Sequence, residues 1–229
     1  MPPTLAHQLA NAARDLREAA GAQGTMDRVV ALALDLVPHA EHAGISLSHR
    51  HRPIDTPAAT SDVVKRVDAL QYDLGEGPCL DALHHEPSVY SPDISIDERW
   101  PAWGPRTAEE IGIRSMMCFQ LFTYENTLGA LNLYASRTGS FDEADQEQGL
   151  ALAAHAAVAV AAAQEIEGLT RALDSRSVIG QAMGILMERF QLGADPAFQV
   201  LARVSSHSNR RIVDIASELV ETRRDPTMS

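Results

Sequence analysis

The sequence predicts an α+β protein in which a mixed helix-and-strand domain is joined by a long helix to a small all-α bundle of three helices. Three observations support this: strand-like alternation and turns before residue 135, an unbroken helical stretch from Glu143, and two short amphipathic segments after Gly193. The expected divisions are an N-terminal helix over residues 1–23, a mixed domain over 24–165 and a helical domain over 166–229.

The first part of the chain alternates helices with strands. Residues 4–20 and 26–37 place apolar side chains at helical spacing, and Pro38 ends the second helix. Residues 44–49 alternate as a half-buried strand does, and residues 62–70 return to helical spacing. Strand pairing can therefore begin only after the second helix.

Loops and a hairpin follow. The glycine-rich stretch 74–78 cannot be regular structure, and residues 90–106, with three prolines and both tryptophans, are expected to form a long irregular segment that covers a pocket. Residues 115–122 and 128–134 are expected to pair as a β-hairpin. The hairpin indicates an antiparallel sheet.

One long helix is expected to start at a capping box formed by Ser140 and Glu143. Residues 150–163 are almost entirely apolar and rich in alanine and valine, too short a run to cross a bilayer but apolar on all sides. We therefore expect a homodimer through the helix at residues 143–190, with packing of the N-terminal helix over the same surface as the alternative.

Two short helices close the chain. Gly193 is expected to cap the long helix, and Asp195 and Pro196 to open a helix over 196–207. A last helix is expected over residues 210–222. Together with the end of the long helix they make the three-helix bundle.

Charge is distributed unevenly along the chain. The net charge is −12, but residues 1–169 hold 11 basic and 24 acidic side chains whereas residues 170–229 hold 8 and 7. A nucleic-acid site in the second part must therefore depend on local clusters. With two cysteines, no leader-like segment and no membrane span, we expect a cytoplasmic protein without a disulfide framework.

Catalytic motifs are absent from the sequence. It contains no nucleophile elbow, phosphate-binding glycine loop or zinc-protease motif, so we expect no enzyme, no catalytic residue and no cofactor. His49 and His51 lack a third ligand nearby, and His84 and His85 are adjacent and point apart, so we expect no metal site.

The mixed domain resembles the GAF family over roughly residues 24–165. The resemblance is carried by Leu128–Leu133 and by Ser140–Asp145, which leads into the terminal helix. It implies an antiparallel sheet of the six-stranded type, with helices behind it and a small-molecule ligand between the sheet and its cover. The candidate pocket residues are Cys79, Tyr90, Trp100, Trp103, Met117 and Phe119.

The helical domain resembles the ANTAR family over about residues 168–224. Ile179–Met187, Ala197–Leu201 and Asn209–Ala216 carry this resemblance. It implies a dimer that binds paired RNA stem-loops and thereby prevents a transcription terminator from forming. Many ANTAR domains have lysine where this chain has Met183, so any RNA contact of that lysine is missing here.

Basic residues near the last helix are the candidate RNA contacts. Arg210 and Arg211 are expected at its start, where free N–H groups favour phosphate, although Asp214 and Glu218 can pair with them instead. The full set of RNA-binding candidates is Arg203, His207, Asn209, Arg210, Arg211, Arg176 and Arg189.

Two other functions remain open from the sequence. The C-terminal bundle can serve only for dimerisation in a ligand-sensing or protein-interaction module that binds no RNA. Alternatively, its last two helices can bind DNA in the manner of a helix-turn-helix.

Overall fold

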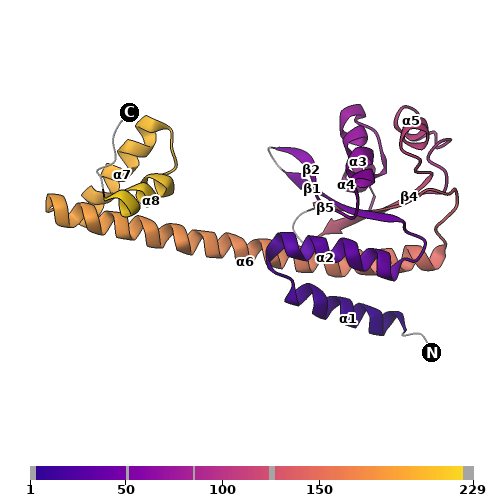
Figure 1. Ribbon diagram of the computed structural model, residues 1–229, viewed down its shortest axis with the longest axis horizontal. Coiled ribbons are helices and arrows are strands. Elements are labelled where there is room, and N and C mark those ends of the chain that lie inside the picture. Colours follow the sequence, from indigo (N-terminus) through magenta and orange to yellow (C-terminus); the bar gives the residue numbers. More distant parts are fainter. Residues whose placement is uncertain (1–3, 50–51, 85, 124–126, 224–229) are drawn as a thin grey trace. The chain divides into compact units, whose positions relative to one another are not determined.

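The computed structural model describes residues 4–49, 52–84, 86–123 and 127–223 (Figure 1). The chain separates into two compact units, Met1–Gln164 and Glu165–Ser229. One continuous helix, α6 (Glu143–Phe190), belongs to both. It continues through Gly168, the position at which the sequence left a break of the long helix open.

The first unit is built on an antiparallel sheet in the order β2-β1-β5-β4-β3. Its strands are β1 (His42–His49), β2 (Arg52–Ala59), β3 (Ser88–Ser91), β4 (Ser115–Phe122) and β5 (Thr127–Ala135). The expected hairpin is confirmed by the pairing of β4 with β5. The described residues form five strands, one fewer than the six-stranded type that the resemblance implied.

Several short elements were not predicted from the sequence. β2 and β3 lie at the two edges of the sheet, and α4 (Pro78–His84) starts at the proline that ends the glycine-rich loop. The stretch over residues 90–106 is not wholly irregular, because it completes β3 and begins α5 (Trp103–Glu110). Such short elements are fixed by tertiary contacts, here pairing with β4 and burial of Trp103, and not by local periodicity.

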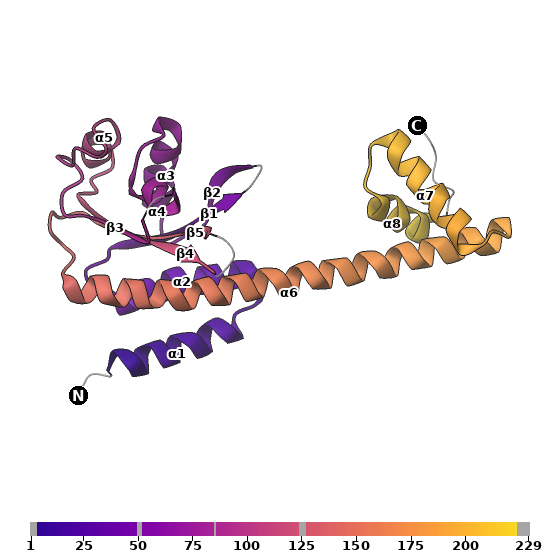
Figure 2. The same ribbon diagram turned by 180° about the vertical axis from the view of Figure 1, so that it is seen from behind.

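Helices cover the sheet on both faces (Figure 1, Figure 2). α2 (Gly21–Leu36) and the first half of α6 cover one face, and α1 (Leu5–Glu18) packs on α2. The opposite face carries α3 (Asp62–Leu74) with α4 and α5. Alternation along β4 sends neighbouring side chains to different cores, because successive residues of a strand point to opposite faces.

The first half of α6 is a core helix of the first unit. Leu152, Ala153, Ala156, Ala157 and Val160 are all buried in the apolar cluster beneath the sheet. α6 is the one helix in the described ranges that is long and apolar enough to span a membrane. Packing of one side of its first half against its own sheet accounts for part of that apolar character, and about a third of the apolar stretch is buried.

The cap of α6 differs from the expected one. Ser140 Oγ donates to the carbonyl of Arg137 at 2.8 Å, and Glu143 is the first helical residue. The reciprocal pair is Asp142 and Asp145, each backbone N–H donating to the other's carboxylate at 2.9 Å. The capping box therefore lies two residues further along, because aspartate accepts these bonds as readily as serine and glutamate do.

The second unit has its own core between the end of α6, α7 (Ala194–Ser208) and α8 (Ile212–Thr222). Its fully buried side chains include Ala182, Leu186, Leu201, Ile215 and Leu219.

The caps in the second unit also correct the sequence analysis. Gln191, and not Gly193, adopts the left-handed conformation after α6, with φ of 55°. Gly193 is the N-cap residue of α7, so Asp195 lies in the first turn of that helix. The glycine does not itself reverse the chain, since its φ is −75°.

Candidate functional site

The two arginines predicted to bind RNA lie just before α8, and not within its first turn. Arg211 is the N-cap residue of α8, with extended backbone, and Arg210 precedes it. Arg211 donates to both carboxylate oxygens of Asp214 at 2.8 and 3.0 Å, and Arg210 donates to Glu218 at 2.7 Å. The internal pairing that the sequence left open is therefore present in the unbound chain.

These ion pairs are open to solvent. The Arg211 side chain is 79% exposed, and its hydrogen bonds lower the pKa of Asp214 while raising the pKa of Arg211 itself. Exposed pairs of this kind are screened by water and exchange readily. A phosphate can therefore replace either carboxylate without uncovering a buried group.

Other candidate RNA residues gather at the same corner. Arg203 and His207 are exposed and lie one turn apart on α7, where His207 Nδ1 donates to the Arg203 carbonyl at 2.8 Å. Asn209, with φ of 51°, then turns the chain towards α8. Five of the seven candidates therefore belong to the α7–α8 corner.

The remaining candidates lie on α6. Arg176 is exposed, whereas Arg189 donates to the carbonyl of Arg223 at 2.9 Å and thereby joins the end of α6 to the end of α8. Met183, at the position where many ANTAR domains have lysine, is half-buried and packs against the helical core. The apolar side chain is thus used for packing.

A second group of residues, in the first unit, surrounds a buried carboxyl group. This carboxyl group lies under α3, on the face of the sheet opposite α6. Asp68 is fully buried and accepts hydrogen bonds from Tyr134 at 2.5 Å, Thr56 at 2.7 Å, Ser46 at 3.2 Å and Gln71 at 3.3 Å. Burial raises the pKa of the Asp68 carboxyl, and the four hydrogen bonds oppose that shift. Within the described ranges, no ion pair neutralises this carboxyl group.

The polar cluster extends around Asp68. Tyr72 donates to Ser46 at 2.9 Å, and so does the Asn132 side-chain amide at 2.9 Å. The Asn132 side-chain oxygen is buried without a partner among the described atoms. Burial raises the pKa of the Cys79 thiol to about 12, so this cysteine is a protonated, unreactive member of the cluster.

The spacing of residues along α3 indicates this cluster, although no site was predicted there from the sequence. Val64, Val67, Asp68 and Gln71 follow the spacing of one helix face, and all four are buried. Polar residues on an apolar stripe are expected to be hydrogen-bonded inside the protein. Asp68 and Gln71 could thus have been selected as site residues from spacing alone.

The six residues expected to line one ligand pocket divide between the two faces of the sheet. Cys79, Trp100 and Trp103 belong to the core under α3, α4 and α5. Tyr90, Met117 and Phe119 lie on the α6 side, where they line a separate pocket. A single pocket containing all six is therefore wrong, because β4 and β3 contribute alternate residues to opposite faces.

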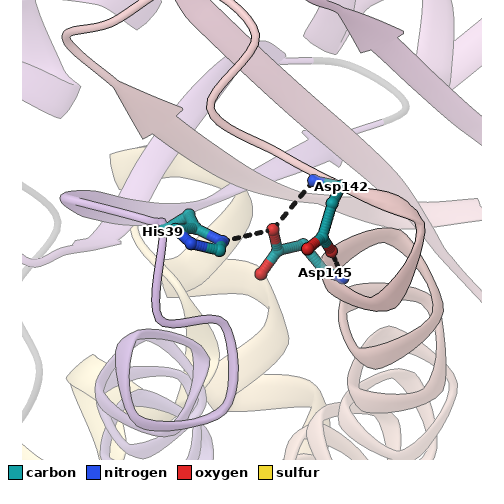
Figure 3. A group of neighbouring side chains, drawn as sticks. All are labelled: His39, Asp142 and Asp145. Carbon is teal, nitrogen blue, oxygen red and sulfur yellow. Dashed lines mark hydrogen bonds and ion pairs between the residues drawn. The ribbon is translucent and has the colours of Figure 1, made fainter.

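A third cluster joins the start of α6 to the loop after α2. His39 Nδ1 lies 2.7 Å from Asp145 Oδ2, and one potential ligand atom from each of His39, Asp142 and Asp145 lies within 4.8 Å of the others (Figure 3). The hydrogen bond to Asp145 raises the pKa of His39. Asp142 and Asp145 form the cap of α6, and His39 hydrogen-bonds to that cap. We therefore assign the cluster a structural role.

Comparison with known proteins identifies both units. The GAF domain family matches residues 19–161 and the ANTAR domain family matches residues 167–220. Among curated proteins, none matched the chain.

Solved structures support the fold of the first unit. The GAF domain from Acinetobacter phosphoenolpyruvate-protein phosphotransferase is 16% identical with a TM-score of 0.58, over 73% of this chain and 99% of that one. The corresponding domain from Coxiella burnetii has the same identity and TM-score, over 72% and 96%. The photosensory core module of Stigmatella aurantiaca phytochrome is 12% identical with a TM-score of 0.58, over 88% and 44%. At these identities the likeness concerns the fold alone.

GAF domains are ligand-sensing domains, and ANTAR domains are RNA-binding domains of antitermination regulators. The GAF match covers more than half of the chain, and the ANTAR match begins directly after it along the same helix. The chain therefore belongs to the GAF domain family and has the GAF–ANTAR architecture of a sensor regulator.

Proposed function

We propose that this protein is a cytoplasmic, non-enzymatic regulator that binds paired RNA stem-loops as a homodimer and so promotes transcription antitermination. The observation that carries the proposal is the ANTAR match, on a helix that runs without a break from the core of the GAF domain. A change at the GAF domain has a continuous route to the RNA-binding unit along α6.

Dimerisation through α6 is supported by a stripe of exposed apolar side chains. Val158, Ile166, Leu169 and Leu173 are 66, 63, 59 and 65% exposed. With Ala162, the last three are spaced 4, 3 and 4 residues apart, which is the repeat of a coiled-coil seam. A second copy of α6 would cover Ala162, Ile166, Leu169 and Leu173, which we name the α6 seam.

RNA contact is assigned to the α7–α8 corner. There Arg210 and Arg211 would exchange their carboxylate partners for phosphates, while Arg203, His207 and Asn209 lie on the adjoining turn. Charge-assisted bonds from a planar guanidinium suit phosphate, which fixes position but carries no sequence information. Arg176 and Arg189 are secondary candidates on α6.

The GAF domain acts in this proposal as a ligand switch without chemistry. Binding of a small molecule would alter RNA affinity by an ordinary allosteric coupling of ~1–3 kcal/mol, or roughly 5- to 150-fold. The buried cluster around Asp68 is the candidate site on the α3 face.

The decisive experiment is a titration of the full chain with a double-hairpin RNA, a single hairpin and duplex DNA. We expect the double hairpin to bind at least tenfold more tightly than the single one, because two units of a dimer engage it together. Equal affinity for all three ligands would contradict the proposal, and preference for the duplex DNA would favour the helix-turn-helix alternative.

Two arginine variants test the contact residues in the same titration. Arg210→Ala and Arg211→Ala should each weaken RNA binding and reduce the salt slope by roughly 1, whatever the RNA sequence. Arg137→Ala, an exposed arginine of the GAF unit, is the control for the change in charge. Unchanged affinity in both test variants would place the RNA contact elsewhere on the ANTAR unit.

A further inference from the structure

A pocket on the α6 face of the GAF sheet is separate from the cluster around Asp68 on the opposite face. It has a volume of about 220 Å³ and lies between β3, β4 and the first two turns of α6. These elements adjoin in both ribbon views (Figure 1, Figure 2). Its lining residues are Ser88, Val89, Tyr90, Met117, Phe119, Glu143, Gln146, Glu147 and Leu150.

The floor of this pocket is apolar and rigid. Met117 and Phe119 are buried beneath it, and the Tyr90 hydroxyl is held by donation to the Phe141 carbonyl at 3.1 Å. Gly149 brings α6 against the Phe119 ring, since a Cβ at that glycine would lie 2.4 Å from Cε2. The aromatic floor therefore has a fixed position, which suits the flat body of a small ligand.

The rim of the pocket is acidic. Glu143 and Glu147 are exposed, lie four residues apart on α6 and border the apolar floor. Like charges at this spacing destabilise a helix. No ion pair or hydrogen bond of either side chain is found within the described residues, although the dipole of α6 favours the charge of Glu143 in its first turn, so both carboxylates at the pocket rim are open to a cationic partner.

From this geometry we infer that the pocket binds a small organic cation, an amine attached to an apolar body about the size of one aromatic ring. The body contacts the half-buried Tyr90 ring and the exposed Leu150 side chain, above the buried Phe119, and the ammonium group lies at Glu143 and Glu147. A neighbouring aromatic face adds a cation–π attraction. The volume is below the roughly 300–1,000 Å³ of drug-sized pockets, which sets the upper limit on ligand size.

The charge arrangement excludes other ligand classes. An anion would be repelled by both carboxylates, and a neutral alcohol of the same shape would gain only the apolar contacts. Because Glu143, Gln146, Glu147 and Leu150 all belong to α6, a bound cation would directly restrain the first turns of the helix that enters the ANTAR unit. The inference concerns ligand binding and does not depend on whether the protein binds RNA.

The test is calorimetric titration of the full chain at pH 7 with 2-phenylethylamine, 2-phenylethanol and 3-phenylpropanoate. We expect the amine to bind, the alcohol to bind roughly tenfold more weakly and the carboxylate to show no binding. Hydrogen exchange should report amine-dependent protection at residues 146–150, because these amides lie next to the pocket. Equal binding of all three compounds, or no binding of the amine at millimolar concentration, would overturn the inference.

Matched variants locate the site. Glu143→Gln with Glu147→Gln keeps shape and should weaken amine binding about fivefold to tenfold, given two partly exposed ion pairs. Glu109→Gln removes an exposed charge from α5, on the other face of the sheet, and should leave binding unchanged. Thermal melting confirms that the variants are folded. Undiminished amine binding in the folded double variant would show that the cation binds elsewhere and would reject the assignment.

Discussion

The two halves of α6 use apolar residues for opposite purposes. In the first half, alanine and valine residues such as Ala156, Ala157 and Val160 are buried beneath the protein's own sheet. In the second half, the larger Ile166, Leu169 and Leu173 are more than half exposed. The most apolar stretch of the sequence therefore has one side in an intramolecular core, and the less conspicuous stretch after it has the larger exposed apolar side chains suited to a partner.

This difference changes how dimerisation should be inferred. The alanine–valine run predicted a dimer because one sheet was not expected to cover it, and the structure buries one side of the run in the core beneath the sheet while Val158 and its neighbours on the other side stay exposed. Small side chains permit this close packing. The proposal of a dimer now depends on the α6 seam and not on the alanine-rich surface.

Ala157 and Val158 provide the sharpest test of the contrast within the first half, because they are adjacent and differ in burial. Ala157→Glu buries an unpaired charge and should cost roughly 3–5 kcal/mol of unfolding free energy. Val158→Glu, at a position 66% exposed, should stay within about 0.5 kcal/mol of the wild type. Urea unfolding measures both, and similar losses in the two variants would show that Val158 is also covered.

A charge introduced into the second half of α6 should weaken dimer association and leave the folding of each chain unchanged. Leu169→Glu places a charge in the α6 seam and should raise the dimer dissociation constant about 100-fold, since it brings two carboxylates together in an apolar contact. Thr170→Glu, exposed and beside the seam, is the matched control. Sedimentation or light scattering at micromolar concentration decides the matter. A Leu169→Glu protein that remains dimeric would remove the α6 seam from the proposed interface.

The sequence predicted the elements whose position is set by the periodic spacing of apolar residues and by turn residues. The β4–β5 hairpin, the continuous α6 and the α7–α8 pair all follow from spacing and from glycine and proline positions. The edge strands β2 and β3 were missed because four to eight residues without clear alternation acquire their structure from sheet pairing.

The sites were harder to predict because they depend on which face a residue occupies. The single predicted pocket divided into two because Met117 and Cys118, adjacent on β4, belong to different cores. Glu143 was expected as part of the capping box, and its place at a pocket beside β3 and β4 is set by tertiary packing. The position of the arginine pair at the start of α8 was predicted from sequence, because a helix start is marked locally, and its contact with RNA stays a prediction.

Two glycines, one in each half of α6, test how closely the backbone of the helix packs against neighbouring residues. Gly149→Ala in the first half should cost roughly 1–3 kcal/mol, because the Cβ meets the buried Phe119 ring. Gly168→Ala in the second half has nothing within 4 Å and should stabilise the helix by up to about 1 kcal/mol. Thermal unfolding should therefore shift in opposite directions. A stabilising Gly149→Ala would show that α6 lies further from Phe119 than described.

The smallest effect concerns the start of α6, where His39 holds the cap of the first half. Its hydrogen bond to Asp145, reinforced by the charge of that carboxylate and of Asp142, raises the folded pKa of His39 above the unfolded value of 6.5. The folded state then binds the proton more tightly than the unfolded chain does, so this stabilisation is complete below about pH 6.5 and is lost as pH rises through the folded pKa. We expect the melting temperature to fall slightly over that window in the wild type. In His39→Gln this component should be absent, since glutamine still reaches Asp145 but does not titrate. Identical pH profiles of the two proteins between pH 6 and 9 would show that His39 does not hold the cap through its charge.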